Sequence, residues 1–218
     1  EQGALPMSVD DAVTMMKPNY DNYCFSENKL ADCMFNSDMV LYCMKSLILH
    51  GVKPKEIVDP NIRTDFNKLA YLVRLDHGLG ENFSVIKEIA EQGEIVTEIV
   101  THFSALEMTD VGNFKSLLFY FGLLSIKGVD MMGRPILHIP NLVVREQLFN
   151  FLIQGYARHD IFKLDVNRLR TLFENMSFKG DWKPMFEFLA EAIREQSRIR
   201  EYIEGEAHIK GFLLAYLS

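Results

Sequence analysis

The chain has 218 residues, of which 48% are hydrophobic, and its formal net charge of -7 gives a sequence pI of about 5.4. This composition excludes a disordered chain, and the acidic balance argues against a dedicated nucleic-acid binder, which usually carries a basic excess. The longest apolar run, Ser116 to Ile126, is far shorter than the ~20 residues that a transmembrane helix needs, so no membrane partner is expected.

Three cysteines are present, Cys24, Cys33 and Cys43. Their number is odd and no two of them form a Cys-x-x-Cys pair, which is not the pattern of a secreted disulfide scaffold. We therefore expect a cytoplasmic protein in which each cysteine is a small buried hydrophobic residue.

Residues 1–80 are predicted to form a helical part. Each of its helices begins at a residue whose side chain can accept hydrogen bonds from the N–H groups of the first turn. A proline or a glycine is expected to end the first two helices. The helices run from Ser8 to Pro18, from Asn36 or Ser37 through His50 to Gly51, and from Thr64 to Asp76, with a loop over residues 18–33.

Residues 81–157 are predicted to form a winged-helix-like module, because their elements follow the order helix, strand, helix, hairpin. A further helix, capped by Asn141, is expected to close this segment near Ala157. The earlier elements are a helix from Phe83 to Glu91, a strand from Glu94 to Val100, a helix from Asp110 to near Gly122, and hairpin strands from Leu123 to Lys127 and from Pro135 to Ile139.

Residues 158–218 are predicted to be helical throughout. One expected helix runs from Asp165 to Met176, and another runs from Glu204 to Leu217. Between them, a third helix begins at a cap at Asp181 and has Pro184 in its first turn. The predicted fold class is therefore mainly α with a small β element: a helical part, a winged-helix-like module with a short hairpin, and C-terminal helices.

Sequence motifs for catalysis are absent from the chain. It contains no phosphate-binding loop, no dinucleotide-binding glycine pattern, no nucleophile elbow and no paired-histidine zinc motif. We therefore predict no catalytic, cofactor-binding or metal-binding residues and no cofactor. Glu201, Glu204 and Glu206 form an acidic cluster that could hold magnesium, but a solvated helix start is the favoured interpretation.

Nucleic-acid binding through the winged helix is an alternative. In that fold the helix before the hairpin usually enters the major groove. Here this helix carries Lys115 as its only basic residue, and the hairpin adds only Lys127 and Arg134. Because affinity depends on the number of phosphates neutralised, we favour a module that packs against protein.

Three runs of residues carry a family resemblance. The run from Tyr20 to Phe25 resembles the Tyr-Asp-Gly-Tyr-x-Phe motif of bacterial AAA-ATPase-like proteins, which commonly carry a C-terminal PD-(D/E)xK nuclease-like domain and abound in gut Bacteroidetes. Residues 117–126 resemble the family's Leu-Leu-Tyr-Tyr-x-Gly-Tyr-Leu-Thr-Ile, and residues 139–145 its Ile-Pro-Asn-x-Glu-Val-Arg. The positions carried over as structural motif residues are Tyr20, Asp21, Tyr23, Phe25, Gly122, Pro140, Asn141 and Arg145.

The chain departs from these motifs at two informative positions. Asn22 stands where the family has glycine, and because both residues tolerate a left-handed backbone, we expect the turn to be kept. Val143 stands where the family usually has glutamate, so any polar role of that side chain is lost here.

The resemblance implies that this chain is a middle segment of such a protein. The family's ATP-binding loop lies before the first motif, and most of its nuclease residues lie after the last helix of this chain. Residues 1–80 would then end an ATPase-like region, residues 81–157 would be a winged-helix connector, and residues 158–218 would lead toward a nuclease-like domain.

On this resemblance we expect a non-catalytic connector or interaction module. Its partner would be another protein or further domains of the same polypeptide. Nucleic-acid binding by the winged helix remains one alternative. The other is a remnant of a metal-dependent nuclease, for which Glu206 is a weak candidate residue.

Overall fold

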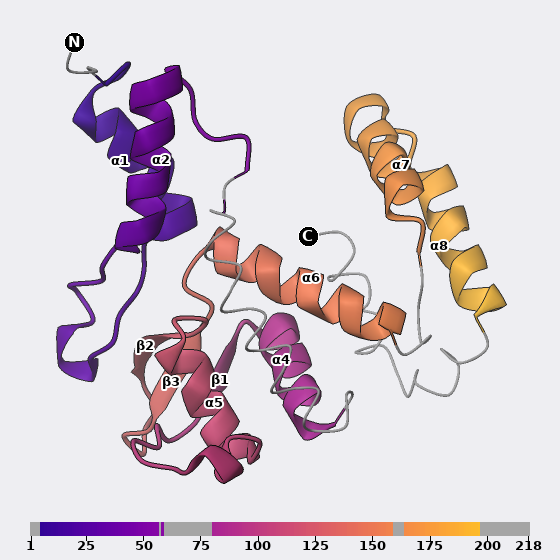
Figure 1. Cartoon of the computed structure of the whole chain (residues 1–218). Helices are drawn as coiled ribbons and strands as arrows, with labels where there is room; N and C mark the ends of the chain where they lie inside the picture. Colours follow the sequence, from indigo (N-terminus) through magenta and orange to yellow (C-terminus); the bar gives the residue numbers. More distant parts are fainter. Residues whose placement is uncertain (1–4, 57, 59–79, 159–163, 197–218) are drawn as a thin grey trace. The chain divides into compact units, whose positions relative to one another are not determined.

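The computed structural model describes residues 5–56, 58, 80–158 and 164–196. These residues are mainly helical and include a small three-stranded antiparallel sheet, which confirms the predicted fold class (Figure 1). The chain divides into two compact units, Glu1–Leu148 and Phe149–Ser218. The predicted helices over 64–76 and 204–217 lie outside the described residues, as does the acidic cluster with Glu206. The division into three functional segments stays a prediction.

Two helices, α1 (Val9–Tyr20) and α2 (Ser37–His50), pack together at the start of the first unit. The predicted caps are confirmed, since the Ser8 hydroxyl accepts from the Asp11 N–H at 3.1 Å and the Asn36 side chain accepts from the Met39 N–H at 3.1 Å. Their shared core consists mainly of buried apolar residues: Ala12, Met16, Tyr20, Met39, Cys43, Leu47, Val58 and Val143.

The predicted end of α1 at Pro18 is wrong. The helix continues to Tyr20, and the Asp21 N–H still bonds to the Lys17 carbonyl at 3.3 Å. A proline this close to a helix end removes only one ladder bond. Burial of the Tyr20 ring in the α1–α2 core favours the extra turn.

The predicted loop between α1 and α2 is partly ordered by hydrogen bonds. Tyr23 and Met34 form an isolated antiparallel bridge in which each N–H donates to the other residue's carbonyl, at 3.0 and 2.9 Å. A single 3-10 turn, η1 (Glu27–Lys29), lies between them. The bridge therefore closes the segment into a loop with a fixed base.

The sheet belongs to a winged-helix-like arrangement. The elements are α4 (Glu81–Gln92), β1 (Glu94–Val96), the 3-10 turn η2 (Ala105–Glu107), α5 (Val111–Tyr120), β2 (Ser125–Val129) and β3 (Pro135–His138). The strand order is β1-β3-β2, with Leu137 of β3 opposite Ile95 on one side and Ile126 on the other. A bulge between Ile126 and Gly128 shifts the β2 register.

The predicted end of β1 and start of β2 are wrong, and both errors have a physical cause. Strand β2 also ends later than predicted, at Val129, and β3 ends one residue earlier, at His138. Strand β1 ends at Val96 because its partner β3 begins at Pro135. The last bond between the two segments is from the Thr97 N–H to the Pro135 carbonyl. Strand β2 begins later than predicted because the N–H groups of Leu123 and Leu124 turn back to the Leu118 carbonyl at the end of α5.

Helix α6 (Leu142–Arg158) follows the sheet, and the Asn141 side chain caps it by accepting from the Val144 N–H at 3.2 Å. This predicted cap is confirmed. Among the described residues, no helix is long and apolar enough to cross a membrane.

The second unit contains the helix pair α7 (Val166–Lys179) and α8 (Lys183–Glu195). The predicted cap of α7 is confirmed, because the Asp165 carboxylate accepts from two N–H groups of the first turn at 3.1 and 3.0 Å. The predicted cap of α8 at Asp181 is wrong. The Asp181 N–H bonds back to the Asn175 carbonyl of α7, and Trp182 occupies the N-cap without a side-chain hydrogen bond.

Candidate functional site

Residues from all three motifs meet at one place in the first unit. The side chain of Asn141 donates to the Asp21 carbonyl at 3.0 Å, and the side chain of Asn22 donates to the Pro140 carbonyl at 3.1 Å. Both bonds join the end of α1 to the start of α6. We call residues 21–24, 122, 125–126 and 140–141 the motif junction.

Ser125, the first residue of β2, links the second motif to the first. Its hydroxyl accepts from the Cys24 N–H at 2.7 Å and donates to the Asn22 carbonyl at 2.7 Å. The Ile126 N–H donates to the Cys24 carbonyl at 3.0 Å. Because Ser125 is completely buried, these bonds satisfy polar groups that water cannot reach.

Tyr23 contacts residues of the other two motifs. Its buried ring lies over Gly122, where an added Cβ would be 3.5 Å from the ring in a left-handed backbone with φ of +70°. Burial raises the pKa of the Tyr23 phenol above its ordinary value, and the nearby side chains of Asn141 and Asn36 act in the opposite direction. The left-handed backbone at Gly122 favours glycine, whereas an added Cβ would make only an ordinary contact with the Tyr23 ring.

Asn22 adopts φ of 72° and is the one residue other than glycine with a positive φ in the described part of the chain. The expected left-handed turn is thus confirmed. Its bond to Pro140 and the bond from Ser125 to its carbonyl hold this turn on both sides. An asparagine can take the glycine position here because its amide gains a partner there.

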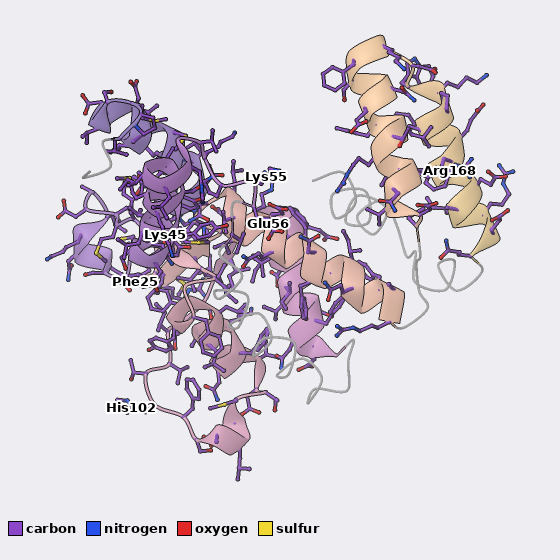
Figure 2. The ribbon with its side chains drawn as sticks, turned by 45° about the horizontal axis from the view of Figure 1, so that its top comes forward. Phe25, Lys45, Lys55, Glu56, His102 and Arg168 are labelled. Atoms are coloured by element: carbon purple, nitrogen blue, oxygen red, sulfur yellow. The ribbon has the colours of Figure 1, made fainter. Side chains whose placement is uncertain are left out.

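The remaining motif residues lie around the junction. Tyr20 is buried in the α1–α2 core with its hydroxyl against the Cys43 thiol, and burial raises its pKa. Phe25, labelled in Figure 2, is partly exposed. Its ring packs against those of Tyr23 and Phe119, at centroid distances of 6.3 and 5.6 Å. Arg145 lies exposed in the first turn of α6.

Val143 stands where the motif that residues 139–145 resemble has glutamate. Its side chain is buried in the α1–α2 core, where an unpaired glutamate would carry a large desolvation cost. The valine instead adds apolar contacts between α6 and the first two helices.

Two contributors to the site are not among the positions that the resemblance carries over. Ser125 supplies side-chain hydrogen bonds, and Cys24 supplies its backbone groups. The available signal was a serine opening a strand directly after an apolar run. The expectation that every cysteine is buried is wrong for Cys33, whose side chain is exposed.

The hairpin offers little free positive charge. Lys127 forms an ion pair with Glu94, and Arg134 pairs with Asp130 at 2.7 Å. The Arg134 backbone N–H is the largest cause that lowers the pKa of Asp130. Helix α5 is mostly buried, with Phe114, Ser116 and Leu117–Phe119 facing inward. Both basic residues of the hairpin are therefore already paired with carboxylates.

Within the described residues, no group of three or more histidine, cysteine, aspartate or glutamate side chains could hold a metal ion. The junction itself consists of side-chain bonds to backbone groups, and its chemistry is that of a structural joint. Comparison with protein-family models, curated proteins and solved structures finds no match to this chain.

Proposed function

We propose that this chain acts as a non-catalytic connector, in which the motif junction joins the α1–α2 helices to the winged-helix-like module. The observation that carries the proposal is the bonding of Asn22, Ser125 and Asn141 to backbone groups of segments more than 100 residues away. Such bonds hold separate elements in a fixed geometry, because a buried polar group that lost its partner could not bond to water instead.

The proposed setting is the AAA-ATPase-like, nuclease-associated family that the motifs resemble. A connector between two active domains needs a joint that keeps the elements on either side of it in a fixed relative orientation. The residues that the resemblance carries over are mostly those that build this joint. Its partners are accordingly other domains of the same polypeptide or a second protein.

The two alternatives have less support. Nucleic-acid binding by the winged helix would need free cationic groups, yet Lys127 and Arg134 are both ion-paired. The nuclease-remnant alternative depends on Glu206, which lies outside the described residues.

Hydrogen exchange of the whole chain tests the connector. Asn141→Ala removes a bond to the first motif, and we expect faster exchange in α1, in the bridge at Tyr23 and in β2, as well as at the start of α6. The matched control is Asn113→Ala, which loses one surface bond to the Glu107 carbonyl. Faster exchange confined to α6 in the Asn141 variant would contradict the proposal.

The family setting needs a separate measurement. The intact mass of the endogenous protein should exceed the 25.2 kDa of this chain if ATPase-like and nuclease-like domains flank it. A mass equal to that of the chain would remove the setting and leave the joint itself unaffected.

A further inference from the structure

Two cysteines face each other at the base of the loop that contains η1. The bridge between Tyr23 and Met34 has both of its hydrogen bonds between the same two residues, so it is a hydrogen-bonded pair of an antiparallel ladder. Cys24 and Cys33 are the next residues on the loop side of this pair. Opposed positions next to such a pair have side chains on one face and Cα atoms about 4.5 Å apart when the chains stay extended.

The two thiols are close enough for Cys24 to contribute to the raised pKa of Cys33. Each also points to a carbonyl of the loop: the Cys24 Sγ to Ser26 at 3.3 Å and the Cys33 Sγ to Leu30 at 3.5 Å. Disulfides form between Cα atoms 4.4–6.8 Å apart, a range that includes the spacing expected here. The loop can therefore be cross-linked without moving the bridge.

Access differs between the two thiols. The Cys33 side chain is exposed, whereas Cys24 is buried with 2% of its surface accessible. Cys33 is thus the thiol that a reagent in solution meets first, and Cys24 lies directly behind it. An exposed cysteine beside a second thiol is the arrangement of redox-sensing pairs.

We propose that Cys24 and Cys33 form a reversible disulfide, which makes the η1 loop a redox-modification site for low-molecular-weight disulfides such as glutathione disulfide. Cys33 loses its proton to solvent, and its thiolate attacks one sulfur of glutathione disulfide. A mixed disulfide forms and one glutathione thiolate leaves. Cys24 then gives up its proton, attacks the Cys33 sulfur and expels the second glutathione thiolate, and the two released protons pass through solvent to the two glutathione thiolates. Two protein thiols are oxidised and one glutathione disulfide is reduced to two glutathiones.

Burial and the nearby Cys24, Asp21 and Asp32 raise the pKa of the Cys33 thiol. The raised pKa favours the thiol over the thiolate, which slows the first step. The cross-link would include a residue of the motif junction, because Cys24 belongs to it and its N–H and carbonyl bond to Ser125 and Ile126.

The reduced chain, freed of reductant and incubated with glutathione disulfide, is examined by intact mass and by peptide mapping without reduction. We expect a product that has lost two hydrogen masses, with one cross-linked peptide pair containing Cys24 and Cys33. Closing a loop of about ten residues should raise the thermal midpoint by ~5 °C. Cys43, buried in the α1–α2 core, should stay reduced and serve as an internal control.

Two variants separate the steps. Cys33→Ser, at an exposed position, should show no intramolecular disulfide, while Cys24→Ala should accumulate glutathione on Cys33. Peptide mapping of the unmodified chain does not depend on whether either variant folds. A stable glutathione adduct on Cys33 in the unmodified chain, or a disulfide between two chains through Cys33, would overturn the proposal.

Discussion

The motif junction and the α7–α8 pair are stabilised in different ways. At the junction, buried polar side chains bond to backbone groups that are 101 to 120 residues away in sequence. In the α7–α8 pair, stabilisation is local: a carboxylate cap at Asp165, a left-handed glycine at Gly180, and an ion pair between Lys183 and Glu187 at 3.6 Å. The junction therefore depends on distant parts of the chain, whereas each of these two helices carries its own signals.

The apolar core between α7 and α8 is small. Leu169, Met185 and Leu189 form the small buried cluster between α7 and α8, while Phe178 and Trp182 remain 87% and 59% exposed. Arg168, labelled in Figure 2, covers the Phe188 ring at 4.7 Å from its centroid. A thin core is compatible with stable helices when their ends are capped, because caps satisfy groups that packing leaves free.

The largest effect is expected for Asn141→Ala. The change removes the α6 cap and leaves the Asp21 carbonyl without its donor in a buried place. Together these losses should lower the free energy of unfolding by about 3 kcal/mol. Urea unfolding followed by circular dichroism measures it.

Asn113→Ala is the matched control for this change, since it loses one bond at the surface. Its effect should stay under ~1 kcal/mol. Equal losses of unfolding free energy in the two variants would mean that the bonds of the motif junction contribute no more to stability than a surface bond does.

Ser125→Ala should have the next largest effect. The Cys24 N–H and the Asn22 carbonyl would each lose their partner in a fully buried site, at a cost of about 2 kcal/mol. The exposed Ser46, whose hydroxyl bonds to the Val52 carbonyl, is the control, and Ser46→Ala should change the unfolding free energy by less than ~0.5 kcal/mol. Thermal unfolding of both variants gives the comparison.

A pair of aspartates tests the local stabilisation of α7 and α8. Asp165→Ala should lower the unfolding free energy of this pair by about 1 kcal/mol, because the cap is lost. Asp181→Ala should change it by less than ~0.5 kcal/mol, since the Asp181 side chain caps neither helix. Trp182 is the single tryptophan, so its fluorescence follows unfolding of the pair. Equal changes in unfolding free energy for the two variants would show that capping does not determine the stability of the α7–α8 pair.

The smallest expected effect concerns His138 in β3. Burial, followed by the charge of Lys127, lowers its pKa below the ordinary value of 6.5. A lowered histidine pKa means that the unfolded chain binds the proton first, so stability is present above pH 6.5 and is lost as the pH falls through the folded pKa. The thermal midpoint of His138→Gln should depend less on pH between about 7 and 5 than that of the unmodified chain. Identical pH profiles would contradict this.

The local part of the fold could be predicted from the sequence. Caps at Ser8, Asn36 and Asp165 place helix starts within a residue, because capping depends on a few neighbouring groups. The predictions failed at Pro18 and Asp181, where burial and a glycine turn decide the outcome. Strand ends failed for a similar reason, since they depend on where the partner strand begins.

The candidate site could be predicted only as separate pieces. The resemblance indicated Tyr23, Gly122 and Asn141, but nothing in their spacing shows that they meet. Their contact depends on the path of the chain through α2 and the sheet, which is a property of the whole unit. Ser125 was not singled out because its local signal, a serine directly after an apolar run, does not show which distant backbone groups it bonds.

The long reach of the junction has a consequence for synthesis of the protein. Asp21 leaves the ribosome 120 residues before Asn141, its hydrogen-bond partner. Helices α1 and α2 can pair early, but the turn at Asn22 must wait for the sheet and the start of α6. Contacts of such sequence separation are slow to form. The junction therefore cannot form until Asn141 has been synthesised, and Cys24 lacks its bonds to Ser125 and Ile126 until β2 has been made.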